Sequence, residues 1–291
     1  MKNTFLACVL IAGFSLSVAE AITIQKSIKG FSSPESVFVG KDFIFVSNIG
    51  EQPETLAKDN DGFISKLNKN GEIIEQKFAT SLNAPKGMLE LKDTIYVVDI
   101  DRLVGFSVKN GKKVFEIEIK GSAFLNDIVA LDFTTLLISD TGTGIIYQID
   151  LKTKTYKEFV RLDLAKFGGG NGMLLSPKKD KLYVAYYHPD GKSGGVVASI
   201  EIASKKITTI YDKKGAYDGI VFAKNGDLLV SDWGENFNGK ILRISTNANN
   251  KTKVQTLELP AMKGPADMFS DGTHLYIPKM LENEVVLIVL P

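Results

Sequence analysis

Short apolar runs, several of them ending in a polar residue, recur along the chain after turn-forming residues. They are FIFVSN at 43–48, TIYVVD at 94–99, LLISD at 136–140, LYVAY at 182–186, LLVSD at 228–232 and LYIP at 275–278. β-Branched and aromatic residues dominate these runs, which is typical of buried β-strands. No later stretch keeps a helical spacing of apolar residues over three turns. The pattern predicts an all-β protein.

A pair of polar or small residues precedes an apolar strand in each of six repeated units. The pairs are Glu35-Ser36, Lys86-Gly87, Asn126-Asp127, Asn171-Gly172, Asp218-Gly219 and Ala266-Asp267. Successive pairs are about 40 to 50 residues apart, which is the length of one four-stranded propeller blade. We therefore expect a six-bladed β-propeller. A β-sandwich or two small β-domains would leave this steady spacing unexplained.

The last of the six units lacks a fourth strand, because the chain ends after the third, at 285–290. The segment ITIQKSI at 22–28 precedes the first unit and has the composition of a strand. We expect it to complete the last blade and close the ring, which removes an exposed sheet edge. The predicted propeller domain covers residues 22–291.

The first 21 residues have the pattern of an export signal. Lys2 precedes an apolar stretch at 5–18, and Ala19-Glu20-Ala21 is a small-x-small cleavage pattern. We expect a protein exported to the periplasm or secreted. The single cysteine, Cys8, lies in this leader, so the mature chain should have no thiol for disulfides, zinc or nucleophilic catalysis. The apolar stretch is too short to span a membrane, and no later one approaches ~20 residues.

The charges of the chain nearly cancel. Lysine and arginine number 35 and aspartate and glutamate 34, which leaves a net charge of +1. This balance gives no electrostatic basis for binding nucleic acid or anionic membranes. We expect a small-molecule substrate, whose identity the sequence does not reveal, and a monomer by default.

The first members of the six pairs should meet around one central tunnel, because the innermost strands of all blades begin there. An Asn-Gly or Asp-Gly pair has an ordinary explanation as a turn former. Glu35 is a weak turn former and lacks that explanation. Two carboxylates and one or two amide oxygens from separate blades would make an all-oxygen site suited to a hard divalent cation. Such an ion, with a position left open, can polarise a carbonyl and acidify a water molecule.

Three further aspartates end the second strands of their units: Asp99, Asp140 and Asp232. We expect them near the same rim as supporting residues, either as ligands or as hydrogen-bond acceptors. An equally good explanation is that each accepts hydrogen bonds from backbone amides of a nearby turn.

Four segments resemble motifs of the senescence marker protein (regucalcin), gluconolactonase and luciferin-regenerating enzyme family. They are 34–37 (PESV), 125–129 (LNDIV), 170–173 (GNGM) and 217–220 (YDGI), and the resemblance extends over all six units. It implies a six-bladed propeller with one divalent ion held by Glu35, Asn171 and Asp218. It also implies Asn126 as a substrate or additional metal contact, and Asp218 as the proton-transfer residue. Calcium is the favoured ion, with magnesium, manganese or zinc as alternatives.

The chain also departs from the family pattern. Sugar-lactonase members have an arginine two residues before the asparagine of the third unit, and this chain has Phe124 there. We therefore expect Phe124 to contact a substrate that is not a sugar lactone. Relatives with paraoxonase-like chemistry use a histidine pair, but the two histidines here, His188 and His274, carry no assigned role.

The sequence supports two functions. The first is an exported metal-dependent hydrolase of a lactone or related ester, with Asp218 as the catalytic residue. The second is a non-catalytic periplasmic binding or scaffold propeller with a structural metal. The acidic segment at 49–61 is the longest candidate for a loop over the substrate pocket, although its composition also fits a solvated loop. Propeller architecture hosts both functions and does not choose between them.

Overall fold

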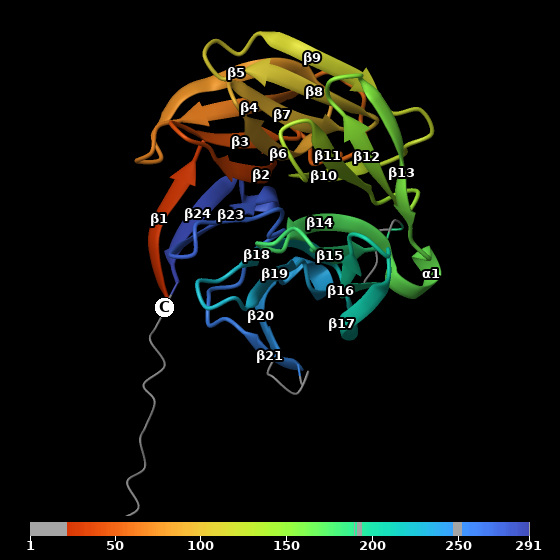
Figure 1. Cartoon of the computed structure of the whole chain (residues 1–291). Coiled ribbons are helices and arrows are strands. Elements are labelled where there is room, and N and C mark those ends of the chain that lie inside the picture. Colours follow the sequence, from red (N-terminus) through yellow and green to blue (C-terminus); the bar gives the residue numbers. More distant parts are fainter. Residues whose placement is uncertain (1–21, 189, 191–193, 247–251, 291) are drawn as a thin grey trace, which may run out of the picture.

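The computed structural model describes residues 22–188, 190, 194–246 and 252–290, and the predicted signal at 1–21 lies outside them. The described residues form six four-stranded antiparallel sheets arranged as a six-bladed β-propeller (Figure 1). The predicted all-β class and the number of blades are confirmed.

The strands of each blade follow one another in sequence through the first five blades. Blade one has β2 (Pro34–Val39), β3 (Ile44–Asn48), β4 (Gly62–Leu67) and β5 (Ile73–Leu82); blade two has β6 (Pro85–Leu91), β7 (Thr94–Asp99), β8 (Arg102–Ser107) and β9 (Lys113–Glu118); blade three has β10 (Leu125–Ala130), β11 (Thr135–Asp140), β12 (Ile145–Asp150) and β13 (Thr155–Arg161).

Blades four and five repeat this order, and helical segments are short. Blade four has β14 (Gly169–Leu175), β15 (Lys181–Tyr187), β16 (Gly195–Glu201) and β17 (Ile207–Gly215); blade five has β18 (Tyr217–Phe222), β19 (Leu228–Asp232), β20 (Lys240–Thr246) and β21 (Thr252–Thr256); the helical segments are α1 (Leu164–Phe167), η1 (Glu235–Phe237) and η2 (Met280–Glu282). No helix among the described residues is long and apolar enough to cross a membrane.

Blade six joins the two ends of the chain. Its strands are β22 (Phe269–Ser270), β23 (His274–Lys279) and β24 (Glu284–Val289), with β1 (Thr23–Lys29) as the outer strand. β1 pairs antiparallel with β24 and lies beside it in Figure 1. The predicted closure by the N-terminal strand is confirmed, and it covers an edge of β24 that would otherwise be open to pairing.

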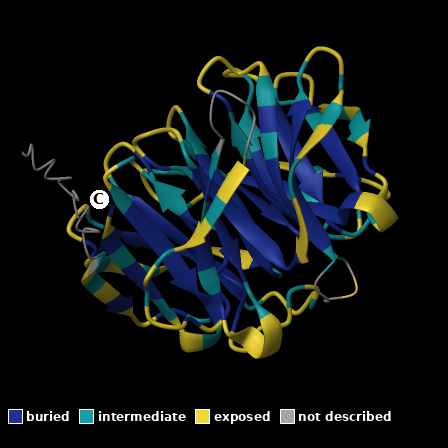
Figure 2. Ribbon diagram, turned by 90° about the horizontal axis from the view of Figure 1, so that it is seen from below, coloured by how far each residue is buried: buried dark blue, intermediate teal, exposed yellow. Residues whose placement is uncertain are grey.

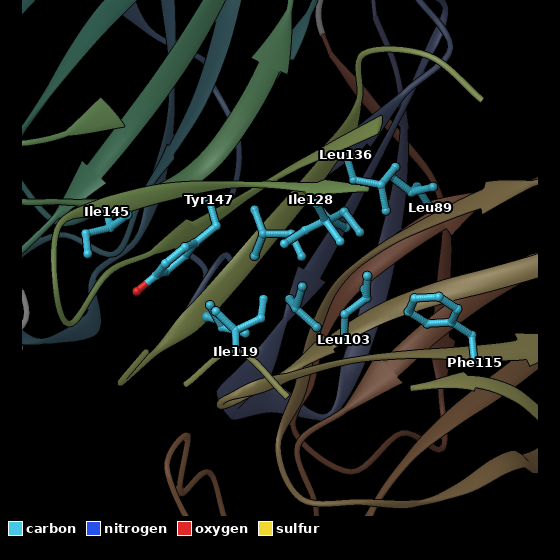
Figure 3. Close-up of a cluster of buried hydrophobic side chains, with 12 residues drawn as sticks. Leu89, Leu103, Phe115, Ile119, Ile128, Leu136, Ile145 and Tyr147 are labelled. Atoms are coloured by element: carbon cyan, nitrogen blue, oxygen red, sulfur yellow. The ribbon is translucent and has the colours of Figure 1, made fainter. Parts of the chain in front are cut away.

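The hydrophobic core lies between neighbouring blades. One cluster joins Leu89 and Leu103 of blade two to Ile128 and Leu136 of blade three (Figure 3). The strands that line the centre and their neighbours are mostly buried, whereas the outer strands and the loops are exposed (Figure 2). Because apolar side chains stack each blade on the next, the inner strands form a rigid wall around the axis.

Candidate functional site

A β-bulge interrupts the first strand of each of blades one to five. The register shifts fall between Pro34 and Ser36, Pro85 and Met88, Leu125 and Ile128, Gly170 and Met173, and Tyr217 and Ile220. The predicted pairs of these five blades thus lie inside strands, and turn formation does not explain their Asn-Gly and Asp-Gly sequences, whereas the sixth pair, Ala266-Asp267, precedes β22. A bulge turns a side chain away from the alternating pattern of the strand. This is the local reason why one polar side chain per blade can face the tunnel.

Serine hydroxyls hold three of these bulges. Ser47 Oγ accepts from Ser36 N at 2.9 Å, Ser139 Oγ from Asp127 N at 2.9 Å, and Ser231 Oγ from Gly219 N at 2.7 Å. Ser139 and Ser231 also donate to a backbone carbonyl oxygen of the next blade, that of Asn171 and that of Ala266. These buried bonds satisfy backbone groups that the bulge removes from the ladder.

All five predicted metal and substrate residues line one cavity of about 280 Å³ at the start of the first strands, which we call the upper cavity. Its lining residues are Glu35, Thr55, Leu56, Lys86, Phe124, Asn126, Asn171, Tyr187, Asp190, Asp218, Trp233 and Met280. Sequence positions far apart along the chain are therefore brought together as the repeat predicted.

Four buried oxygens of this cavity have no hydrogen-bond partner among the residues that the structure describes. They are Glu35 Oε2, Asn126 Oδ1, Asn171 Oδ1 and Asp218 Oδ1. An unpaired buried acceptor costs free energy, so four together in a folded site indicate a missing electropositive partner. Two carboxylate and two amide oxygens are the ligand types that a hard divalent cation prefers. The residues therefore fit a metal ion.

Amides have to supply part of any such ligand set. No group of three or more histidine, cysteine, aspartate or glutamate side chains within the described ranges is arranged to hold a metal. Glu35 and Asp218 would contribute the negative charge, and Asn126 and Asn171 neutral oxygens. A site of this composition favours ions with oxygen ligands over zinc.

Burial and mutual repulsion shift the pKa values of the two carboxyls. Burial raises the pKa of Glu35 well above its usual value, and the negative charge of Asp218 raises it further. Burial raises the pKa of Asp218 to about 8, and the nearby Asp267 adds to the rise. A divalent ion would offset both effects by stabilising the ionised forms.

These shifts predict how the stability of the metal-free protein depends on pH. The folded protein keeps a proton on Asp218 between pH 4 and about 8, a range in which the unfolded chain releases it. Since the folded state then binds more protons, this group stabilises fully at low pH and its contribution is lost as pH rises to 8. We expect the melting temperature of chelator-treated wild type, relative to Asp218→Asn, to fall from pH 5 to pH 8. A difference that does not change with pH would contradict the shift.

Lys86 is a cavity residue to which sequence reasoning assigned no role. It is completely buried, and its ammonium group donates to the carbonyl oxygens of Thr55 and Ala84, both at 2.8 Å. Its Nζ atom lies 5.0 Å from the centre of the Phe124 ring. Burial lowers the pKa of Lys86 to about 8, while Glu35 opposes the shift. One feature of the sequence could have identified Lys86 as a cavity residue: it is the first residue of the second repeated pair, Lys86-Gly87.

Trp233 fixes one of the two carboxylate oxygens of Asp218. The indole Nε1 donates to Asp218 Oδ2 at 2.8 Å, which leaves Oδ1 as the oxygen without a partner. Trp233 packs against Phe237 and lines the cavity wall. The hydrogen bond sets the orientation of the carboxylate toward the cavity.

The acidic segment at 49–61 forms part of the cavity wall. Thr55 and Leu56 line the cavity, and Lys86 holds Thr55 through its carbonyl oxygen. Glu51 and Glu54 are exposed. The segment thus lines the pocket and also carries exposed acidic residues.

Asp99, Asp140 and Asp232 do not line the upper cavity. Asp99 accepts from the amides of Asn83 and Ala84, and Asp140 from those of Ala123 and Phe124, while Asp232 accepts from that of Ala216. In each blade these amides directly precede the first strand. The aspartates therefore position the chain that enters the site and make no contact with its open space.

The two histidines pair with aspartates. His188 Nδ1 lies 2.7 Å from an oxygen of Asp190, which lines the upper cavity. His274 begins β23 and lies 3.0 Å from Asp271. Neither histidine lines the upper cavity.

No protein-family model matches the chain, and no curated protein matches it. Solved structures do match. A streptogramin B lyase is 14% identical, with a TM-score of 0.61, over 91% of this chain and 97% of its own. Virginiamycin B lyase from Staphylococcus aureus is 18% identical, with a TM-score of 0.60, over 93% of this chain and 100% of its own.

A chain of a nidogen/laminin complex has the same fold, with 15% identity and a TM-score of 0.59 over 87% of this chain and 88% of its own. Identities this low show the fold alone. Since enzymes and a protein of a protein–protein complex share it, function has to be argued from the site.

Proposed function

We propose that this protein is a metal-dependent hydrolase of an ester or lactone whose body is apolar, acting in the upper cavity. The observation that carries the proposal is the set of four unpaired buried oxygens from Glu35, Asn126, Asn171 and Asp218. A divalent cation, calcium or magnesium first, would be held by Glu35, Asn171 and Asp218, with Asn126 beside them. When bound, it would supply Lewis-acid polarisation of the scissile carbonyl and of a water molecule.

Asp218 would accept the proton of the attacking water. Its Oδ1 atom has no partner, and Trp233 holds the other oxygen, so the carboxylate is oriented before substrate arrives. A carboxylate with an elevated pKa is a better base than an exposed aspartate. The same residue would also be a ligand, and the ion would lower that pKa toward the working range.

Lys86 would stabilise negative charge that develops on the carbonyl oxygen. An ammonium group has three hydrogens, and only two of them are donated to Thr55 and Ala84. The third is free to donate to an oxyanion in the cavity. A donor that is already oriented in a water-poor site is worth far more than one in solvent.

Apolar residues around these groups support a hydrophobic substrate. Leu56, Phe124, Trp233 and Met280 all line the cavity. The ammonium of Lys86 already lies near the Phe124 ring, so this side chain offers a flat apolar surface beside the reacting groups. Phe124 also stands where sugar-lactonase members have an arginine, which keeps a sugar lactone out of the proposal.

The test is an ester and lactone panel on the purified protein, before and after chelation, in water enriched in ¹⁸O. Hydrolysis places one ¹⁸O in the carboxylate product and stops when the metal is removed. A product without ¹⁸O would overturn hydrolysis in favour of elimination, the type of reaction that the names of the two lyase neighbours suggest. A metal-replete protein inert on the whole panel would favour the binding or scaffold function.

Replacing Glu35 with glutamine tests the metal site alone. The change keeps the size of the side chain and removes one of the two negative charges offered to the ion. We expect metal affinity to fall by at least about 10- to 100-fold, the loss typical of changing a residue that only supports a ligand. The fold is kept because apolar contacts between blades do not involve Glu35. Calorimetric titration with calcium measures the affinity, and circular dichroism checks the fold. Unchanged stoichiometric binding would remove Glu35 from the ligand set.

A further inference from the structure

A second, larger cavity lies at the opposite end of the first strands. It has a volume of about 590 Å³ and is lined where those strands end, by residues such as Met88, Ile128, Met173, Ile220 and Met268. We call it the lower cavity. Because the upper cavity is lined where the same strands begin, the two cavities lie toward opposite ends of the tunnel. The volume is that of a typical small-molecule pocket.

Four carboxylates line the lower cavity, Glu90, Asp127, Asp267 and Asp271, and two of them lie deeper among the apolar residues. Asp127 is buried, with 6% of its surface exposed, and Asp267 is partly buried; both line the lower cavity. They are close enough that the charge of Asp267 raises the pKa of Asp127. In the part of the chain that the structure describes, neither pairs with a lysine, arginine or histidine. Ionising both buried carboxyls at once is costly without a cation, so the pair would stabilise a positively charged group that enters the cavity.

The carboxylates keep acceptor capacity for such a partner. Asp127 Oδ2 accepts from Met173 N at 2.6 Å, and Asp267 Oδ2 accepts from Ser36 Oγ at 2.6 Å. These bonds hold both side chains in place across neighbouring blades. Each carboxylate oxygen has two lone pairs, so further donors can be accepted.

The chemistry around the pair selects among cations. A divalent metal needs six or more oxygen ligands. Besides the pair, among the lining residues only Glu90, Ser270 and Asp271 have side-chain oxygens, and the rest of the lining is apolar. An ammonium group needs only two or three acceptors, and an attached hydrocarbon would pack against the walls. Methionines, of which three line the cavity, adapt to hydrocarbon of varied shape.

We propose that the lower cavity binds an amphipathic primary amine, with its ammonium group on Asp127 and Asp267 and its hydrocarbon body against the methionine-lined wall. The site lies in a different cavity from the proposed metal site, with Asp267 near enough to Asp218 to raise its pKa, and it does not depend on the hydrolytic reaction. The propeller would then bind a second ligand, a cation with a hydrocarbon body, besides the substrate of the upper cavity.

The test is calorimetric titration of the full-length mature protein with n-octylamine, which is protonated at pH 7 like a lysine side chain. Octanol and octanoate have the same hydrocarbon body without the positive charge. We expect one octylamine per chain and binding at least ten-fold weaker for the other two. Equal binding of octanoate and octylamine would overturn the proposal.

Asp267→Asn should weaken octylamine binding at least ten-fold. Asp271→Asn is the matched control, because Asp271 is an exposed carboxylate of the same cavity lining and should change binding less than two-fold. If both variants weaken octylamine binding equally, the effect comes from the overall negative charge of the cavity and not from Asp267. That result would overturn the proposal. Should Asp267→Asn fail to fold, Asp127→Asn serves as the second variant.

Two further measurements separate the lower cavity from the metal site. Glu35→Gln should lose metal affinity and keep octylamine binding. Calcium titration of wild type should give one equivalent, not displaced by octylamine. A second calcium equivalent bound instead to Asp127 and Asp267 would compete with octylamine and disappear in Asp267→Asn. That result would identify the lower cavity as a metal site and overturn the proposal.

Discussion

Asp218→Ala should lower kcat by about 10³-fold on any ester or lactone that the wild type hydrolyses. The substitution removes the proposed base, which is typically worth 10²–10⁴-fold, together with one metal ligand. It also leaves the Trp233 Nε1 donor without its acceptor. Steady-state kinetics at saturating metal measure the loss, and metal analysis of the same sample separates loss of the ion from loss of the base.

Asp232→Asn is the matched control for this variant. Asp232 is a buried aspartate of the same blade, but it accepts backbone amides and does not line the upper cavity. We expect its kcat to stay within about three-fold of wild type while stability falls by about 2 kcal/mol, the value of a lost hydrogen bond to a charged group. Equal kinetic losses in the two variants would count against Asp218 as the catalytic residue.

Gly172→Ala should destabilise the fold by about 2 to 3 kcal/mol, although it adds one methyl group. A Cβ atom at Gly172 would lie 2.2 Å from the carbonyl oxygen of Asp218, a backbone atom of the neighbouring blade. Backbone cannot swing aside as a flexible side chain does, so blades four and five would have to separate, at the cost typical of overpacking. Urea denaturation of the metal-free protein measures the change in unfolding free energy.

Gly170→Ala is the control two residues away in the same strand. Its added Cβ would meet Val184 Cγ1 at 3.4 Å, an ordinary contact. We expect a change within about 0.5 kcal/mol, because alanine also restricts the unfolded chain. If Gly172→Ala is as well tolerated as Gly170→Ala, the close approach of the two blades at the tunnel is not a constraint on the fold.

Gly172 illustrates where sequence reasoning failed and why. Asn171-Gly172 and Asp218-Gly219 look like turn sequences, because asparagine, aspartate and glycine are the common turn residues. In the protein each pair lies in a bulged strand, and each glycine makes room for the neighbouring blade: Gly172 for Asp218, and Gly219 for Ala266. Local composition reports which conformations a residue tolerates, whereas this contact is between blades about 50 residues apart.

The sequence by itself determined the repeat. Strand composition and a steady spacing specified six units, the missing fourth strand of the last unit specified closure by residues 22–28, and the first members of the pairs specified which side chains meet. These features were readable because each depends on periodicity along the chain, and a closed ring converts equal spacing into convergence on an axis. The metal, the reaction and export remain predictions.

Only the tertiary structure decided which of the converging residues act together. It placed Lys86 in the upper cavity, directed Asp99, Asp140 and Asp232 to backbone amides, and left Asp127 and Asp267 facing a second, largely apolar cavity. The physical reason is that hydrogen bonding, burial and charge pairing depend on distances across blades. A bulge of one residue decides which end of the tunnel a side chain faces, and no spacing in the sequence records it.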